Sequence, residues 1–67
     1  MSTGNVKWFN AAKGFGFVEQ DDGGSDVFAH ISNFADSNMR ELVENQKVEF
    51  EVVRGNKGLQ AENIVAI

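Results

Sequence analysis

Two phenyl rings stand two residues apart in one short run of the chain, residues 13–19, which has the sequence KGFGFVE. At the twofold period of a β-strand, Phe15 and Phe17 share a face with Glu19, while the two glycines and Val18 share the other. Glu19 has no obvious buried partner, which favours its face as the one in water. Rings kept in water suggest a binding surface. From this run alone, the alternative that both rings lie in the core stays open.

A second run, residues 26–32, repeats the pattern with the sequence DVFAHIS. Its alternation separates three aliphatic residues from Phe28, His30 and Ser32, and the polar members predict that this second set faces water. Two neighbouring strands would then form one patch with a cation at its edge: Phe15, Phe17, Phe28, His30 and Lys13. Flat rings beside a cation can stack unpaired bases and hold their phosphates.

The overall charge argues against this interpretation, because nucleic-acid-binding domains are usually basic and this chain of 67 residues has a formal net charge of −4. The acids crowd into residues 21–26 and 41–51, away from the run between Lys7 and Phe17. A local cationic strip can still act if the acids lie elsewhere, since screening is effective beyond about 8 Å at physiological salt. We therefore expect modest, salt-sensitive binding with a large share from stacking.

The composition limits the other classes of protein. There is no Cys, so there is neither a disulfide nor a cysteine-ligated metal, and one His with no recognisable nucleophile argues against an enzyme. Residues 21–26 lack the further oxygen ligands of a calcium loop, and the glycines at 14 and 16 lack the helix start of a phosphate loop, so we expect no cofactor. No apolar run approaches the length of a membrane span and no export signal is evident, which predicts a cytoplasmic protein.

Five strands are expected to position these residues within one small domain, residues 1–67. The strands are predicted over residues 5–10, 15–20, 26–31, 47–54 and 59–67. Turn residues separate them at 21–25, 45–46 and 55–58, and residues 32–34 favour a short helical turn with Ser32 as its cap. We predict an all-β fold in which meander-like antiparallel strands close into a barrel, because five short strands cannot easily leave two long open edges.

Two of these strands need an irregularity. In the first, simple alternation places Trp8 in the core with Val6, and an exposed Trp8 requires a bulge or strong twist near Lys7. Both interpretations stay open from the alternation alone. In the last strand the parity slips before Ile64, which predicts a bulge at residues 62–63.

Three motifs in register resemble the bacterial cold-shock proteins: KWFN at residues 7–10, KGFGFV at 13–18 and DVFAHIS at 26–32. The resemblance covers the whole chain, including GNKGLQA at 55–61. It implies a five-stranded OB-type barrel that binds single-stranded RNA and DNA without strict sequence choice. The two ribonucleoprotein-like motifs of the family would be residues 13–18 and 27–31, whose surface rings stack bases. Trp8 is also a surface stacker in the family, which favours the bulge.

Four positions depart from the family pattern. Ile31 and Met39 stand where the family usually has aromatic rings. Leu59 stands where Pro is common, and Asn45 where Gly is common. A lost base–ring stack is worth roughly 1–3 kcal/mol, although Ile and Met still offer apolar contact. We therefore expect weaker binding than in a relative with every ring in place.

The leading hypothesis is a nucleic-acid chaperone or antiterminator that binds unpaired strands and shifts RNA hairpins toward the melted state without ATP. Stacking is assigned to Trp8, Phe17, Phe28 and His30, with Phe9, Phe15, Ile31 and Met39 beside them. Phosphate contacts are assigned to Lys7, Lys13 and Lys57. Hydrogen bonds to base edges are assigned to Asn10, Asp26 and Gln60.

The alternative hypothesis is a protein-interaction module, which the acidic balance mildly favours. The aromatic patch would then receive a peptide, or a second copy of the chain by strand exchange through residues 32–46, although a monomer is the main expectation. A titration followed by Trp8 fluorescence discriminates the two hypotheses. Saturable, salt-sensitive quenching by a single-stranded oligonucleotide supports the first, and indifference leaves the second.

Overall fold

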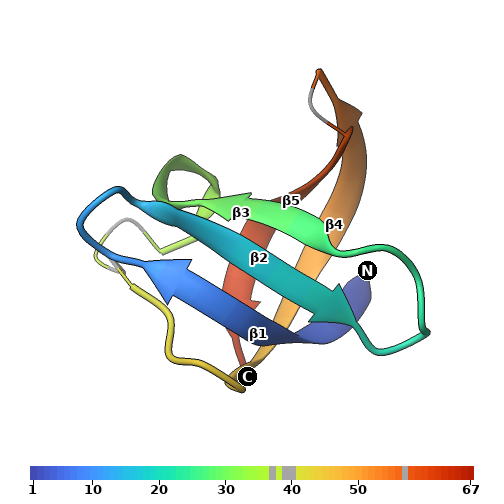
Figure 1. Ribbon diagram of the computed structural model, residues 1–67, viewed down its shortest axis with the longest axis horizontal. Helices are drawn as coiled ribbons and strands as arrows, with labels where there is room; N and C mark the ends of the chain where they lie inside the picture. Colours follow the sequence, from blue (N-terminus) through green and yellow to red (C-terminus); the bar gives the residue numbers. More distant parts are fainter. Residues whose placement is uncertain (37, 39–40, 57) are drawn as a thin grey trace.

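The computed structural model describes residues 1–36, 38, 41–56 and 58–67. Within these ranges the elements are β1 (Ser2–Asn10), β2 (Phe15–Gln20), β3 (Val27–His30), the 3-10 helix η1 (Ile31–Asn33), β4 (Lys47–Gly55) and β5 (Gly58–Ala66). The strands close into a barrel in the order β1-β2-β3-β5-β4, with β4 paired to β1. Strands β1, β2 and β3 lie side by side on one face of the molecule, and β4 and β5 lie behind them (Figure 1).

The closed five-stranded barrel expected from the sequence is confirmed, and two details of its topology were wrong. The order is not a meander, because β5 rather than β4 lies beside β3. The β3–β5 pair is also parallel, meeting at Phe28 and Gln60, whereas the other pairs are antiparallel as predicted. The reason is that β4 crosses to pair with β1, so the strand returning from β4 is the one that closes onto β3.

Several strand boundaries also differ from the prediction, by one to three residues. Strand β1 begins at Ser2, because residues 2–5 find partners on β4 that the local sequence does not reveal. Strand β3 ends at His30, and the helical turn covers Ile31–Asn33 with His30 as its N-cap, where the sequence predicted Ser32 in that position. The helical residues therefore start one residue earlier than expected and the cap lies two residues earlier, on the last ring of the 26–32 motif.

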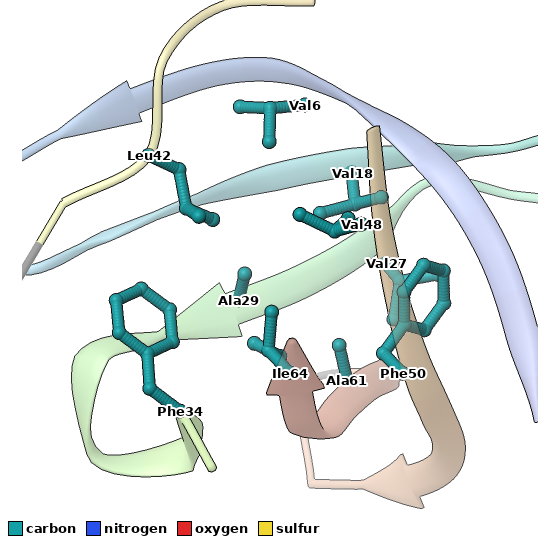
Figure 2. Packing of buried hydrophobic residues seen from close by; sticks show 10 residues of the cluster. All are labelled: Val6, Val18, Val27, Ala29, Phe34, Leu42, Val48, Phe50, Ala61 and Ile64. Atoms are coloured by element: carbon teal, nitrogen blue, oxygen red, sulfur yellow. The ribbon is translucent and has the colours of Figure 1, made fainter. Parts of the chain in front are cut away.

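Alternate side chains of the strands point into the barrel and form one apolar core (Figure 2). Phe34 and Leu42 lie outside the strands and complete this core. The buried set is Val6, Val18, Val27, Ala29, Phe34, Leu42, Val48, Phe50, Ala61 and Ile64. The predicted inward faces of β2, β3 and β4 are thus confirmed, with Val52 only partly buried. Burial of the aliphatic set on β2 and β3 leaves Phe15, Phe17 and Phe28 on the outer face.

Glycine is required behind the aromatic rings of β2. A Cβ added to Gly16 would lie 2.7 Å from Phe9 Cα and 2.8 Å from Phe9 Cδ1, which no side chain tolerates without movement of β1. Gly14 has a φ of +78°, and a Cβ there would lie 3.2 Å from Ile31 Cδ1. The space on the inner side of this run is therefore filled by Phe9 and Ile31, and the backbones of β1 and β2 approach closely.

A β-bulge in β1 decides where Trp8 lies. Val6 pairs with Val18, but Trp8 pairs with Phe17, so Lys7 is an extra residue with no partner of its own on β2. The bulge predicted near Lys7 is confirmed. Val6 is buried while Trp8 is 41% exposed, because the inserted residue reverses the parity and turns the indole outward.

The bulge predicted in the last strand is confirmed as well. Glu49 pairs with Val65 and Glu51 pairs with Glu62, so two residues of β5 lie opposite one residue of β4. One of the two, Asn63, has a φ of 52°, a left-handed conformation that Asn tolerates better than most residues. The shift restores the inward direction of Ile64 and keeps the end of β5 in the core.

Candidate nucleic-acid interface

Five rings from three neighbouring strands form a continuous aromatic platform, which consists of Trp8, Phe15, Phe17, Phe28 and His30. The ring centroid of Trp8 lies 5.7 Å from that of Phe15 and 5.5 Å from that of Phe17. Phe28 lies 5.7 Å from both phenylalanines of β2 and 6.3 Å from His30. Trp8 is exposed and the other four rings are half-buried, so the platform presents a large apolar surface to water.

Strand pairing sets the order of the rings. Phe17 lies directly opposite Phe28, and Phe15 lies opposite His30 in the β2–β3 ladder. Cross-strand aromatic pairs stabilise a sheet by roughly 0.2–1 kcal/mol each relative to small residues. The Phe17–Phe28 pair meets edge to face at 71° and the Phe15–Phe28 pair at 30°, so the rings support one another in fixed orientations. The platform is therefore preorganised before any ligand arrives.

Two apolar residues assigned to the site lie elsewhere. Phe9 packs against the core, with its ring centroid 5.9 Å from that of Phe34. Ile31 also packs against the core and covers Gly14. The structure does not bring either side chain into the aromatic platform, and their contact with a ligand stays a prediction.

The turn between β1 and β2 carries two further assigned residues. Asn10 Oδ1 accepts a hydrogen bond from the backbone N–H of Lys13 at 3.0 Å, and the carbonyl of Asn10 accepts one from Gly14 at 2.7 Å. The side chain of Asn10 therefore stabilises the turn that follows β1. Lys13 is exposed in this turn, between the strands that carry Trp8 and Phe15.

Lys7 and Asp26 were assigned to different ligand groups, and the structure joins them to each other. Lys7 Nζ lies 2.9 Å from Asp26 Oδ2. This hydrogen bond, with the charges of Asp26 and Glu19, raises the pKa of the Lys7 ammonium above its ordinary value. A phosphate at this end of the platform must therefore compete with Asp26 for Lys7. Gln60 lies beside Phe28 across the β3–β5 pair. Met39 and Lys57 fall outside the described residues.

Ser32 belongs to this region, although it was not among the predicted site residues. Its backbone N–H donates to His30 Nδ1 at 3.1 Å, and its Oγ lies 2.9 Å from the same nitrogen. The sequence signal that pointed to Ser32 was its preference for a helix cap, which the structure gives to His30 instead. The last ring of the platform is thus tied to the turn that follows it.

A second ion pair borders a polar groove that extends to Lys7. Lys47 Nζ lies 2.6 Å from Asp21 Oδ2, and Thr3 Oγ1 donates to the same oxygen at 2.9 Å. These two hydrogen bonds lower the pKa of Asp21, that from Lys47 having the larger effect. A groove of about 610 Å³ beside them is lined by polar residues that include Glu44 and Asn45. Among residues 1–36, 38, 41–56 and 58–67, no group of three acidic or histidine side chains could hold a metal ion.

Comparison with known proteins identifies the class. The "'Cold-shock' DNA-binding domain" family matches residues 2–67, so this chain belongs to the cold-shock domain family, whose members bind nucleic acids. The described residues include no helix long and apolar enough to span a membrane.

The chain is 63% identical to "Cold shock-like protein CspA" of Stigmatella aurantiaca over 67 residues, which cover 100% of this chain and 98% of the relative. It is 59% identical to "Cold shock protein ScoF" of Streptomyces coelicolor, with 96% of each chain covered. A solved structure of "drosophila Unr CSD456" superposes with a TM-score of 0.78 at 29% identity, over 98% of this chain and 26% of that chain. The solved structure agrees in fold with the barrel described above, and the names of the two sequence relatives agree with the family.

Proposed function

We propose that this protein binds single-stranded RNA and DNA through the aromatic platform and acts as an RNA chaperone or antiterminator. The observation that carries the proposal is the contiguous set of rings left on the outer face of β1, β2 and β3. A surface of flat rings is costly in water and suits the unstacked faces of bases. Stacking tolerates sequence, because every base has a π-face. In this proposal the protein acts in the cytoplasm as a monomer, and its targets are transcripts.

The proposed action on RNA is passive and needs no chemical energy. A protein that binds only the unpaired strand stabilises that strand by mass action, by about 2.7 kcal/mol when its concentration is 100 times the dissociation constant. This energy is about that of two average base-pair steps on the scale of DNA, where one step is worth about 1.4 kcal/mol. Short or imperfect hairpins would therefore melt or fail to form, and strong ones would persist. Low temperature strengthens RNA pairing, which is the condition where such an activity matters most.

The test is a titration of the protein with oligo-dT and oligo-U, followed by the fluorescence of Trp8, which lies within the platform. We expect saturable quenching by both oligomers and little quenching by a DNA duplex of equal length, because paired bases cannot lie on the rings. Binding should weaken with salt, with a slope of about 0.7 in log–log form for each phosphate contact. An unchanged spectrum with all three ligands would contradict the proposal and favour a protein-interaction module.

A further inference from the structure

The ring of His30 has a task besides its place in the aromatic platform. It is the N-cap of η1, with φ −125° and ψ 148°, and its Nδ1 accepts a hydrogen bond from Ser32 N–H at 3.1 Å. Ser32 Oγ lies 2.9 Å from the same nitrogen. Caps are usually made by Ser, Thr, Asp or Asn, whose side-chain oxygen accepts the bond. Here the acceptor is an imidazole nitrogen, so the orientation of the His30 ring depends on the turn η1.

These contacts determine which ring nitrogen carries the proton. A backbone N–H can only donate, so Nδ1 of His30 is an acceptor and has no hydrogen in the neutral ring. The hydroxyl of Ser32 is then a second donor to Nδ1. The proton therefore resides on Nε2, on the side of the ring away from the turn. Among the hydrogen bonds found within the described ranges, none uses Nε2.

The Nε2–H bond of His30 points away from the face of the ring on which a base would stack. It lies in the plane of the ring, so it can bond only to an acceptor beside the ring and not to a base on the face. The ring of His30 is tilted by 32° from that of Phe28, with the centroids 6.3 Å apart. Its face thus continues the platform while its edge stays available. One imidazole can stack a base and donate a hydrogen bond at the same time.

We propose that Ser32 is a positioning residue for this interface. By holding Nδ1, it fixes His30 as the Nε2–H tautomer, with one face toward a stacked base and the N–H toward an acceptor oxygen of the same strand. This inference rests on the proposed function. The acceptor is a phosphate oxygen or a base carbonyl, which offer the same chemistry to an N–H donor. Without the Ser32 hydroxyl only the backbone N–H of residue 32 holds Nδ1, so the ring can turn more freely about its broad χ2 well, which misdirects the donor.

The first test is spectroscopic and needs no ligand. In the 15N spectrum recorded at alkaline pH, His30 should show an unprotonated Nδ1 and a protonated Nε2. Ser32→Ala removes one of the two donors to Nδ1 and should move the Nδ1 resonance, and Ser32→Thr, which keeps the hydroxyl, should restore it. Ser2→Ala at the start of β1 is the matched control. An Nδ1 resonance that does not move in Ser32→Ala would overturn the inference.

The second test is binding of oligo-dT to the same variants. Loss of one neutral hydrogen bond corresponds to about threefold to tenfold in affinity. His30→Phe keeps a flat ring without either nitrogen and should show this loss, and Ser32→Ala should show about a threefold loss that Ser32→Thr recovers. Equal binding by the parent, His30→Phe and Ser32→Ala would overturn the inference while leaving the platform intact. Failure of the parent itself to bind would instead refute the proposed function.

A set of modified oligomers identifies the acceptor. Each carries one methylphosphonate linkage or one abasic position, and each is titrated against the parent and His30→Phe. If one methylphosphonate removes the difference between the two proteins, the acceptor is a phosphate oxygen. If one abasic position removes it, the acceptor is a base carbonyl. A difference that persists through the whole set would show that the N–H has no acceptor on the strand and would overturn the inference.

Discussion

Side chains alternate between inward and outward on both sides of this barrel, but the outward side chains of the two sides differ in kind. On β1, β2 and β3 the outward positions hold the rings of the aromatic platform. On β4 and β5 they hold carboxylates, with Glu51 directly opposite Glu62 and Glu49 beside Val65. Figure 1 shows these two groups of strands at the front and the back of the molecule. Three of the ten acidic residues, Glu49, Glu51 and Glu62, thus lie on the strands behind the rings, and Lys47 and Arg54 lie on β4 with them.

The inward-facing residues of the two sides differ as well. This difference explains why the rings of β2 are not needed to fill the core and can lie on the surface. Behind the acidic strands the core is filled by their own side chains, Phe50 and Ile64 among them. Behind the rings of β2 the inner positions are Gly14 and Gly16, and residues from other segments fill the space. A barrel this small needs little volume at that point, so the large side chains of β2 can all face outward.

The largest effect should come from the glycine behind the platform. We expect Gly16→Ala to lower the free energy of unfolding by an amount at the upper end of roughly 1–3 kcal/mol, because its Cβ would overlap the backbone and ring of Phe9. Urea denaturation measures the change. Gly23→Ala is the control, since its Cβ meets nothing within 4 Å and only the φ of +85° is strained, which costs about 1 kcal/mol. Equal losses in the two variants would show that close packing behind the rings is unimportant.

Removal of one platform ring should weaken nucleic-acid binding, whereas removal of an apolar side chain from β5 should not. Phe28 touches three of the other rings, and Phe28→Ala should weaken oligo-dT binding by roughly 1–3 kcal/mol. Val65→Ala removes an exposed apolar side chain from the acidic side and should leave the affinity unchanged. Fluorescence titration measures both, with circular dichroism to confirm folding. Similar losses in both variants would refute the assignment of binding to the platform.

The two ion pairs provide a smaller contrast. Asp26→Asn releases Lys7, which precedes Trp8 of the platform, and Asp21→Asn releases Lys47 on β4, although both lysines line the polar groove. We expect tighter binding of oligo-dT by Asp26→Asn, with a log–log salt slope steeper by up to about 0.7, because one more phosphate is neutralised. Asp21→Asn should bind as the parent does. Weaker binding by Asp26→Asn would show instead that the carboxylate itself contacts a base edge.

The smallest effect concerns stability at low pH. Hydrogen bonds from Lys47 and Thr3 lower the pKa of Asp21 below its ordinary 3.8. A lowered pKa in the folded state contributes stability above the unfolded value, and this is lost as the pH falls through the folded pKa, below about pH 4. Because Asp21 is exposed, the effect should be slight. Urea midpoints should fall less steeply on acidification in Asp21→Asn than in the parent, and parallel curves would contradict the pairing.

Local patterns predicted much of this molecule. Alternation in residues 13–19 and 26–32 placed the rings of Phe15, Phe17 and Phe28 outside, because a side-chain period of two needs no long-range information. The parity of the first strand required a bulge for an exposed Trp8, and the bulge lies at Lys7. The count of five short strands favoured a closed barrel, and the match of short motifs to a known family implied the same fold. The faces of the strands and the bulge depend on neighbours along the chain, so the local sequence predicts them.

Other features depend on partners far away along the chain. The parallel pairing of β3 with β5, the Lys7–Asp26 ion pair and the inward position of Phe9 follow from how the barrel closes. The part of His30 as a cap is similar, because it requires the end of a strand and the start of a turn to meet at one residue. The sequence by itself determined which faces carry rings, since alternation is local. Only the tertiary structure decided which side chains restrain one another, since those contacts form when distant segments close into a barrel.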